Sequence, residues 1–419
     1  MNVRAGRNRP MTESPWPLRT IGELAAKEPN SITDGPFGSK LKTVHYTASG
    51  PRVVRLANIG DGVFIDAKAH ISDEHFATLQ KHRVFPGDLV FAALGENPPR
   101  SCLVPDDLGP AIVKADCIRF KPGPLLSPKF ANYALNSNFT RQKLKGTIHG
   151  VGRPRLNLTE IKGIAIPVPP LGEQRRIVAE IEKQFTWLEA AVTTLTRVRA
   201  NATRYRRALL AAAYSDLNSP FRRLDEIASI TGGLTKNQRR ENLKRRLPYL
   251  RVANVYHGEL HLDNIAYIGV HDREIEKLLL RRGDLLVVEG NGSKDQIGRV
   301  AVWNGSIDPC LHQNHLIKVR PTTQLVRSEW IALWLQSPRG RQEIERVASS
   351  TSGLYTLSIR KVAGLVVPVP AVAVQDAIVR DVEQRMSFVE RMDQVVGTSL
   401  VRAKNLRQSI LLRAFSGQL

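Results

Sequence analysis

Residues 166–177 read IPVPPLGEQRRI and residues 367–378 read VPVPAVAVQDAI, so one short stretch occurs twice, 201 positions apart. Each copy starts with a β-type run and then passes through prolines that fix the backbone. It ends in a run of residues with a helical pattern. In the first copy Glu173 would lie in the first helical turn, where the helix dipole favours a negative charge. Each copy therefore predicts a strand that leaves a globular domain directly into a helix.

Further repeats lie outward from this joint. RLAN at residues 55–58 recurs as RVAN at residues 251–254, and PGDLV at residues 86–90 recurs as RGDLL at residues 282–286, both shifted by 196. The change of the shift from 196 to 201 places five extra residues in the second copy, between Asp284 and Val362. We interpret the chain as one globular domain and one long helix that have been duplicated.

The segment after each joint has the pattern of a long helix. Residues 173–217 contain neither Gly nor Pro, and about 42 helical residues would span roughly 60 Å. Apolar residues recur at alternating steps of four and three, which predicts a heptad seam. Gly397 lies inside the second helix and is expected to soften it, at a cost of about 1 kcal/mol relative to Ala. The residues expected to pair the helices are Ile177, Ile181, Leu188, Leu195 and Leu209, followed by Ile378, Val382, Val389, Val396, Leu406 and Ile410.

Each apolar stripe needs a partner, which is either the other helix of the chain or a second copy of the protein. The chain order favours the first arrangement. The second domain begins where the first helix ends, and the second helix leaves that domain, so folding back pairs the two helices antiparallel. A parallel pair would require the intervening domain to bridge roughly 60 Å. We therefore expect an intramolecular antiparallel coiled coil.

The fold class that follows is α+β. It comprises two similar mixed α/β domains separated by two long helices, with pseudo-twofold symmetry. Strands are expected at 52–56, 89–93, 112–120 and 164–168 and at matching second-copy positions, and helices at 128–144 and 327–347, without the regular alternation of a parallel sheet. The expected segments are a disordered basic tail at 1–17, globular domains at 18–170 and 218–370, and helices at 171–217 and 371–417.

Charge narrows the class of partner. The net charge is +22 and the sequence pI is about 10.3, which is typical of proteins that bind polyanions, with nucleic acid as the first candidate. No stretch approaches the roughly 20 apolar residues of a membrane span. Cys102, Cys117 and Cys310 lack metal-site spacing and are odd in number, which favours a reducing, cytoplasmic location.

The joint also carries a family resemblance. IPVPPLGEQRRI resembles the motif that enters each long helix in the specificity subunit of type I restriction–modification systems. The second copy keeps Pro368, Pro370, Gln375 and Ile378, but it has Ala371 in place of a proline. DGPFGSK at 34–40, FPGDL at 85–89 and the terminal AFSGQL at 414–419 are also similar to motifs of that family. The similarity extends over the chain after residue 16.

The resemblance implies a non-catalytic DNA-reading subunit. Its globular segments would be target-recognition domains, each reading one half of a bipartite target, and the helices would set a fixed gap between the halves. The helices would also recruit two methyltransferase subunits, and endonuclease/translocase subunits would complete the complex. No cofactor is expected on this chain, because S-adenosylmethionine, ATP and Mg²⁺ belong to the partner subunits in this family.

Basic residues in Gly-rich loops are the candidate DNA contacts. Most would bind phosphates and position the protein, and only a few would read base edges. The first-domain candidates are Lys40, Lys42, Arg52, Arg55, Arg100, Arg141, Lys143, Lys145, Arg153 and Arg155. The second-domain candidates are Lys236, Arg239, Arg240, Lys244, Arg245, Arg246, Lys294, Arg299, Ser352 and Tyr355.

Two other function classes stay open from the residues alone. The sequence NPPR at 97–100 is similar to the NPP(Y/F) signature of amino-methyltransferases, but Arg100 replaces the aromatic residue that stacks on a flipped base. A stand-alone DNA-modifying enzyme would also need a Gly-rich cofactor loop, which the sequence does not contain. A coiled-coil scaffold is the second alternative, and it leaves the two basic domains unexplained.

Overall fold

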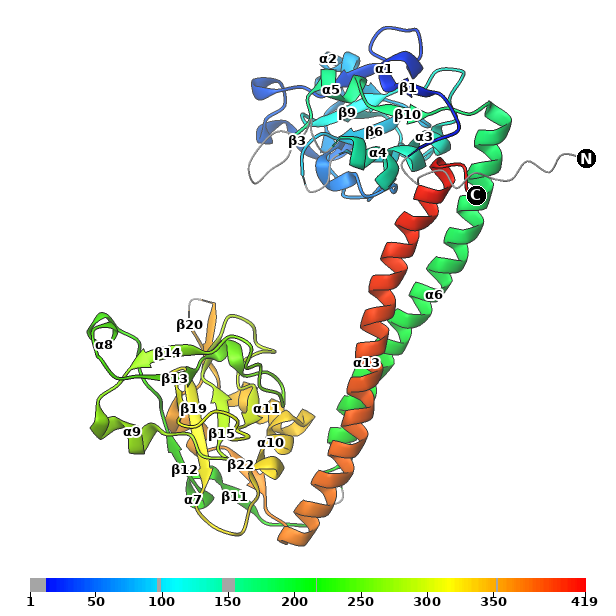
Figure 1. Ribbon diagram of the computed structural model, residues 1–419. Coiled ribbons are helices and arrows are strands. Elements are labelled where there is room, and N and C mark those ends of the chain that lie inside the picture. The colour runs from blue at the N-terminus through cyan, green and yellow to red at the C-terminus, as the bar shows by residue number, and fades with distance from the viewer. Residues whose placement is uncertain (1–12, 96–98, 145–154, 216, 352) are drawn as a thin grey trace, which may run out of the picture. The chain divides into compact units, whose positions relative to one another are not determined.

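The computed structural model describes residues 13–95, 99–144, 155–215, 217–351 and 353–419. The chain divides into two compact units. The first comprises Met1–Leu195 with Thr398–Leu419, and the second comprises Thr196–Gly397. Each unit holds one globular domain and parts of both long helices, so we describe each by itself (Figure 1).

The domain of the first unit contains two four-stranded sheets. One is antiparallel throughout, in the order β2-β9-β6-β7, and the other has the order β4-β3-β8-β5 with β3 and β8 parallel. The strands of the first sheet are β2 (Ile32–Asp34), β6 (Leu89–Ala92), β7 (Arg100–Leu103) and β9 (Cys117–Phe120). Those of the second sheet are β3 (Tyr46–Val54), β4 (His70–Ile71), β5 (Arg83–Val84) and β8 (Ala111–Val113).

The domain of the second unit repeats this topology, except that its described residues form no counterpart of β5. Its antiparallel sheet has the order β12-β19-β15-β17, and its other sheet has the order β14-β13-β18 with β13 and β18 parallel. The strands of the first of these are β12 (Ala228–Thr231), β15 (Leu285–Val288), β17 (Val300–Val302) and β19 (Leu316–Pro321). Those of the second are β13 (Arg246–Leu250), β14 (Ala266–Gly269) and β18 (Leu311–His312). The predicted pair of similar mixed α/β domains is confirmed.

The first and last strands of each domain pair with each other. β1 (Leu18–Thr20) is antiparallel to β10 (Ala165–Pro167), and β11 (Phe221–Arg223) is antiparallel to β22 (Val366–Pro368). The chain therefore enters and leaves each domain at one place. The exit strand is followed within a few residues by the long helix, as the joint sequence predicts.

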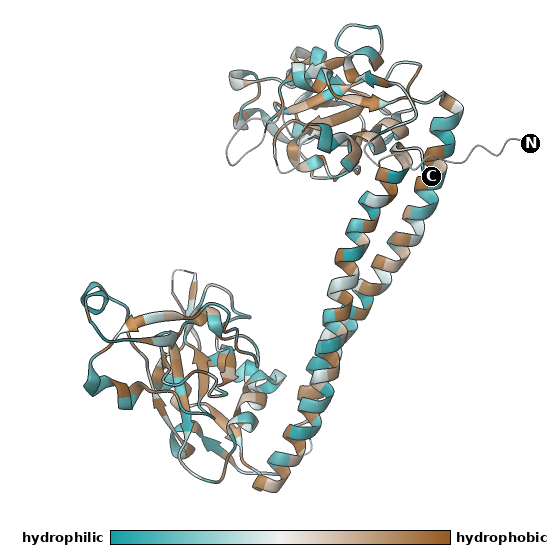
Figure 2. Ribbon diagram, viewed as in Figure 1, coloured by the Kyte–Doolittle hydropathy of each residue, from teal (hydrophilic) through white to brown (hydrophobic). Residues whose placement is uncertain are grey.

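Helices cover the antiparallel sheet of each domain, and their apolar faces form the core with the strands (Figure 2). Phe91, Phe120 and Phe130 are fully buried in the first domain, and Trp330 and Trp334 are buried in the second. The first-domain helices are α1 (Ile21–Leu24), α2 (Asp73–Thr78), α3 (Pro128–Leu135), α4 (Asn138–Lys143) and α5 (Leu158–Lys162). Those of the second are α7 (Leu224–Ile227), α8 (Gln238–Glu241), α9 (Asp272–Leu278), α10 (Ser328–Gln336), α11 (Pro338–Val347) and α12 (Ile359–Ala363).

Three predicted elements are each two elements in the structure. The strand expected at 112–120 is interrupted at Asp116, whose φ of 64° forms the turn between β8 and β9. The helix expected at 128–144 is broken at Ser137, whose side chain accepts a hydrogen bond from the backbone N–H of Thr140 and so caps a new helix. The helix expected at 327–347 is broken in the same way at Ser337, which precedes Pro338.

One glutamine fixes the joint between each domain and its helix. Gln174 is fully buried, and its amide Nε2 donates to the carbonyl oxygens of Leu125 (2.9 Å) and Pro169 (2.8 Å). Its Oε1 accepts from the backbone N–H of Ser127 at 2.8 Å. Gln375 makes the equivalent three bonds, to Leu325, Pro370 and Arg327. The repeated sequence of the joint thus buries an amide that donates two hydrogen bonds and accepts one in each copy.

The long helices are α6 (Leu171–Ala212, 42 residues) and α13 (Val372–Phe415, 44 residues). In the second unit, ion pairs join Arg199 to Asp393 and Arg206 to Glu390, each at 3.1 Å. Residue numbers rise along α6 as they fall along α13, so the helices are antiparallel, as predicted. Gly397 lies within α13 without interrupting it.

The helix seam differs in phase from the prediction. Every seventh predicted residue is buried in α13 (Val382, Val389, Val396 and Ile410), but Leu406 is 51 % exposed. The other inward positions of α13 fall one residue later than predicted. Met386 is buried, whereas a step of seven from Ile378 leads to Arg385, and Arg407, next to Leu406, has its guanidinium 4.1 Å from the Phe185 ring centroid. In α6 the residues Ile177, Ile181 and Leu209 are buried, and Leu188 and Leu195 are half-buried, as is Ile378 in α13.

Among the described residues, no helix is long and apolar enough to cross a membrane.

Candidate nucleic-acid interface

A glycine in close backbone contact begins the basic segment of each domain. A Cβ on Gly35 would lie 2.1 Å from the backbone of Lys114, and a Cβ on Gly233 would lie 2.1 Å from the carbonyl oxygen of His312. Both contacts follow the second sheet of their domain at equivalent places, after β8 and within β18. Only glycine fits at these two places. The two basic segments therefore begin at equivalent positions beside the second sheet of each domain.

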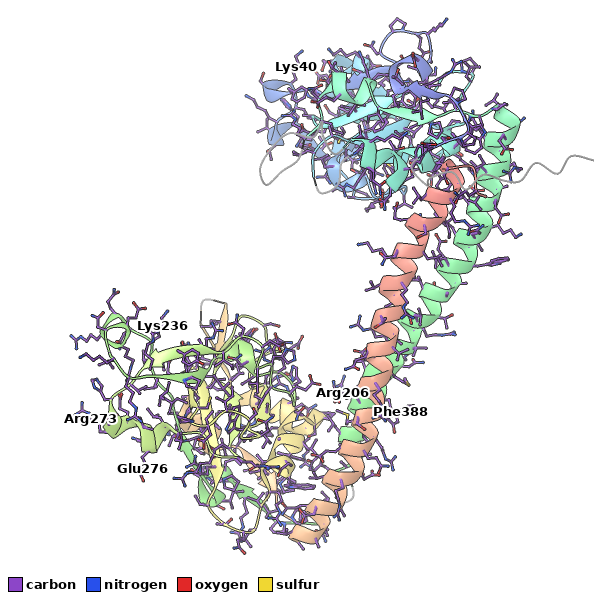
Figure 3. All side chains as sticks on the ribbon, in the orientation of Figure 1. Lys40, Arg206, Lys236, Arg273, Glu276 and Phe388 are labelled. Carbon is purple, nitrogen blue, oxygen red and sulfur yellow. The ribbon has the colours of Figure 1, made fainter. Side chains whose placement is uncertain are left out.

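The segments after these glycines carry exposed cations. Lys40 and Lys42 are exposed in the first domain, and Lys236, Arg239 and Lys244 are exposed in the second (Figure 3 labels Lys40 and Lys236). Within the described chain, no carboxylate lies within 4 Å of Lys40, Lys42, Arg239 or Lys244, while Lys236 is 3.7 Å from Glu241. Cations free of carboxylates are the type of side chain that binds phosphate oxygens.

The second domain also has a hollow beside these cations. One of its lining residues, Tyr267, was not predicted from the sequence. It has a volume of about 260 Å³ and is lined by Lys236, Arg246, Arg251 and Tyr267, among others. Tyr267 is 59 % exposed on β14, while its neighbour Ile268 is buried. The Arg246 guanidinium donates to the carbonyl oxygen of Tyr267 at 3.2 Å. The two-residue alternation of β14 was the signal that places Tyr267 on the outer face.

Besides Lys236, six candidate cations are paired with carboxylates. The Arg240 guanidinium makes two bonds to Glu274, at 2.7 and 2.9 Å, and this pairing lowers the pKa of Glu274 to about 2. Arg240 belongs to the basic segment and Glu274 belongs to α9, so this ion pair holds the segment against α9. The other pairs are Arg52–Asp66, Arg141–Asp61, Arg155–Asp116, Arg245–Asp272 and Lys294–Glu345.

Two candidate arginines donate hydrogen bonds to carbonyl groups of their own domains, and their contacts with DNA stay predictions. Arg55 is half-buried and donates to the carbonyl oxygens of Ala67 (3.4 Å) and Lys68 (3.3 Å). Its repeat equivalent Arg251 donates to a carbonyl in the same way. Arg299 is 9 % exposed, and its guanidinium lies 5.1 Å from the Tyr256 ring centroid and donates to the Val252 carbonyl oxygen. The guanidinium therefore contacts groups of its own domain.

The remaining candidates have mixed positions. Arg100 is half-buried in β7, and Tyr355 is half-buried in β21 (Leu354–Thr356), which pairs with β16 (Gly290–Asn291) and β20 (Ser349–Thr351). Lys143 is exposed with its ammonium 4.3 Å from the Phe139 ring centroid, and partial burial lowers its pKa. Lys145, Arg153 and Ser352 lie outside the described residues, as does part of the NPPR stretch.

The sequence of this chain is similar to those of known proteins. The family profile described as "Type I restriction modification DNA specificity domain" matches residues 80–192. The specificity subunit of the type I restriction enzyme EcoKI, from Escherichia coli K12, is 26 % identical over 324 residues, which cover 73 % of this chain and 68 % of that subunit. Over most of its length the chain is therefore similar to specificity subunits of type I restriction enzymes. The EcoBI specificity subunit from Escherichia coli is 23 % identical over 418 residues, covering 93 % of this chain and 84 % of that protein.

Two solved structures share the fold of this chain. A chain from a study of complex assembly and conformational transition of the type I R-M system superposes with a TM-score of 0.73 at 20 % identity, covering 96 % of this chain and 98 % of that one. The HsdS subunit from Thermoanaerobacter tengcongensis superposes with a TM-score of 0.54 at 19 % identity, covering 96 % and 97 %. At these identities the likeness concerns the fold.

Proposed function

We propose that this chain is the non-catalytic subunit that gives a type I restriction–modification complex its DNA sequence specificity. Each globular domain, 18–170 and 218–370, acts as a target-recognition domain and binds one half of a bipartite target. The observation that carries the proposal is the duplication itself. The same strand order of the antiparallel sheet and the same buried glutamine at the joint occur twice in one chain. So does a basic segment that begins at a closely packed glycine.

The long helices act as the spacer between the two half-sites. α6 and α13 each run without a break for 42 and 44 residues, and each is fixed to its domain by a buried glutamine. A continuous helix resists bending, and a fully bonded joint resists rotation. These two features support a gap of constant length between the half-sites.

The exposed cations position the protein on the duplex. Lys40 and Lys42 in the first domain, and Lys236, Arg239 and Lys244 in the second, neutralise phosphates, so binding weakens as salt rises. Base reading falls to polar and aromatic side chains beside them, with Tyr267 and Arg246 at the rim of the second-domain hollow. The paired cations such as Arg240 hold these segments in shape.

Catalysis belongs to the partner subunits in this proposal. Two methyltransferase subunits bring S-adenosylmethionine to the target adenines, and endonuclease/translocase subunits supply the ATP- and Mg²⁺-dependent steps. The chain itself recognises the target sequence on the DNA and provides a surface on which the other subunits assemble.

The test is to map methylated adenines across a genome by single-molecule sequencing after co-expression of this chain with its methyltransferase subunit. The proposal predicts a split motif of two short defined blocks around a gap of fixed length. A continuous motif, or methylation that does not depend on this chain, would contradict it. Salt-independent binding of the methyltransferase with no DNA binding would instead support the coiled-coil scaffold.

A further inference from the structure

Two histidines of the first domain lie against each other beside its exposed lysines. The ring centroids of His45 and His75 are 4.1 Å apart, and the ring planes are tilted by 34°. His45 ends the 3₁₀ turn Thr43–His45 of the basic segment, and His75 belongs to α2. Both side chains are half-buried. The ring contact therefore joins the segment that carries Lys40 and Lys42 to α2.

Each imidazole also bonds to the backbone of one of these lysines. The Nδ1 atom of His45 accepts a hydrogen bond from the backbone N–H of Lys42 at 3.0 Å. The Nε2 atom of His75 donates to the carbonyl oxygen of Lys40 at 2.9 Å. Leu41, between the two lysines, is buried in a small apolar cluster that includes Ile71. Leu41 thus attaches the segment to the domain, and the two histidines fix the backbone on either side of it.

The second domain holds its basic segment by an ion pair at the corresponding place. β14 and α9 follow β13 as β4 and α2 follow β3. The pair joins Arg240 of the segment to Glu274 of α9, and this pairing lowers the pKa of Glu274 to about 2. Both groups therefore stay charged at any pH above about 4. The two domains attach equivalent segments by contacts that differ in their response to pH.

The bond made by His45 depends on the protonation state of its ring. Nδ1 can accept the N–H of Lys42 only when it carries no proton, and a protonated imidazole is a donor at both nitrogens. Histidine side chains ordinarily take up this proton as the pH falls from about 8 to 5. The bond made by His75 differs, because its Nε2 donates to a carbonyl in either state. A fall in pH therefore removes the bond between His45 and the basic segment.

The surroundings of the pair do not stabilise an added positive charge. In the described part of the chain, carboxylate oxygens lie within 4 Å of the imidazoles of His261 and His315, in the second domain, and of neither His45 nor His75. Nearby lysines disfavour a further cation. The charged and titratable side chains on the elements around the pair are Asp34, Lys40, Lys42, Tyr46, His70, Asp73, Glu74, Lys81 and His82.

A third histidine beside the segment does not share the role of His45. His82 is 4 % exposed, and its Nδ1 donates to the carbonyl oxygen of Asp34 at 2.6 Å. Burial lowers the pKa of His82, and Lys81 and Lys40 lower it further. Its bond to the segment is made through a nitrogen that carries a proton in the neutral ring, so a fall in pH does not remove it.

We propose that His45 and His75 are positioning residues for the phosphate-binding lysines of the first domain, and that protonation of His45 loosens the segment. This inference rests on the proposed function and adds a pH dependence to one of its two DNA sites. The first domain should bind its half-site more weakly as the pH falls through the range in which histidines titrate. The second domain keeps its segment in place through Arg240 and Glu274.

The chain itself contains the replacement for His45 that does not titrate. Asn58 and Asn254 each end a 3₁₀ turn, and each side-chain oxygen accepts from the backbone N–H three residues earlier at 2.8 Å. His45→Asn should therefore keep the bond to Lys42 at every pH. His45→Arg removes the acceptor and adds a permanent charge. His70→Gln is the matched control, since His70 is a half-buried histidine of the same domain that bonds to a backbone carbonyl outside the segment.

The first measurement is hydrogen exchange of the full chain between pH 5.5 and 8, corrected for the intrinsic exchange rate at each pH. In the wild type and in His70→Gln, protection of residues 38–45 should fall roughly three- to tenfold from pH 7.5 to 5.5, as loss of one hydrogen bond implies. Residues 236–245 should show no such fall. His45→Asn should abolish the fall, and His45→Arg should lack the protection already at pH 7.5. Protection of 38–45 that is independent of pH in the wild type, or that falls equally in His45→Asn, would overturn the proposal.

The second measurement is binding of the full chain to a duplex that carries its mapped target, by fluorescence anisotropy at constant salt. From pH 7.5 to 5.5 the wild type should lose roughly three- to tenfold in affinity relative to His45→Asn. Histidines that only added charge near the phosphates would strengthen binding instead. A wild type that gains affinity relative to His45→Asn would therefore overturn the proposal. A chain that binds no duplex at either pH would contradict the proposed function, and hydrogen exchange would still show whether His45 holds the segment.

Discussion

In the first domain the buried Asp88 is held by Arg119, whereas in the second domain the equivalent Asp284 is held by Arg320, from a different position of the same strand. The register shows the change: Arg119 lies opposite Val90, and the residue in its place, opposite Leu286, is Lys318. Lys318 is 1 % exposed and donates to the backbone carbonyls of Lys277 and Leu279.

In both copies the aspartate side chain accepts a hydrogen bond from the backbone N–H three residues before it. Asp88 accepts from the backbone N–H of Phe85 at 2.9 Å, and Asp284 accepts from that of Arg281 at 2.7 Å. The turn before the central strand is therefore closed in the same way in both domains, while the counterion has moved. Duplication has preserved the framework through backbone bonds and has left the partner side chains free to diverge.

The largest expected difference between the copies follows from removing this aspartate. Asp88→Ala leaves Arg119 buried without a counterion, and we expect a loss of about 3–5 kcal/mol in the stability of the first domain. Asp284→Ala should cost less, roughly 1–3 kcal/mol, because the Arg320 side chain is 24 % exposed against 6 % for Arg119 and reaches water. Hydrogen exchange of each domain's central strands measures both losses. Glu28→Ala, in an exposed pair with Lys121, is the control, and equal losses in the two domains would contradict the comparison.

The buried Lys318 should give the second domain a pH dependence that the first lacks. Burial lowers the pKa of Lys318 from 10.5 to about 8, so the unfolded chain binds more protons between these values. Stability of the second domain should then rise as the pH increases from about 8 to 10.5, by on the order of 2 kcal/mol. In Lys318→Met this rise should be absent. Denaturation curves at pH 7.5, 9 and 10 measure the difference, and parallel pH profiles for the two proteins would refute it.

The two joints should respond equally to loss of their glutamine. Gln174→Ala and Gln375→Ala each remove three hydrogen bonds from a buried site, which we expect to cost about 2 kcal/mol in either domain. Gln394→Ala, on the exposed face of α13, serves as the control. Thermal unfolding gives the shifts. A large effect at one joint and none at the other would mean that the domains are not fixed to their helices in the same way.

The smallest effects are expected at single phosphate contacts. Lys42→Ala and Arg239→Ala each remove an exposed cation without a carboxylate partner in the described chain. Each should reduce the slope of log affinity against log salt by about one and weaken DNA binding a few-fold without changing the target. Arg155→Ala, whose charge is already paired with Asp116, should change the slope less. Fluorescence anisotropy over a salt series measures these slopes, and a larger change for Arg155→Ala would reverse the assignment.

Much of the fold was predictable because its signals are local or repeated. The joint at 166–177 and its copy at 367–378 predicted the exit strands and the start of both helices, and the absence of Gly and Pro predicted the length of α6. The phase of the seam was not predictable. Two heptad phases share every seventh residue, and only contact with the partner helix, such as Arg407 on Phe185, distinguishes them.

The candidate interface was predictable as a composition but not as a set of residues. A basic residue in a loop looks the same in sequence whether it lacks a carboxylate partner among the described residues, as Lys42 does, or is paired, as Arg240 is with Glu274. The carboxylate partners are distant in sequence and meet only in the folded domain. Tyr267 is the opposite case, since strand alternation marked it as outward-facing and the charge-based search passed over it.

The most direct test of the two-reader account is a chain in which residues 221–368 also replace residues 18–167, so that the same domain occurs at both ends of the helices. The exchange points are equivalent because β11–β22 and β1–β10 close the two domains in the same register. With the methyltransferase subunit present, single-molecule sequencing should report a target made of two copies of one half-site at the original gap. An unchanged target, or one in which both half-sites are new, would contradict independent reading by the two domains.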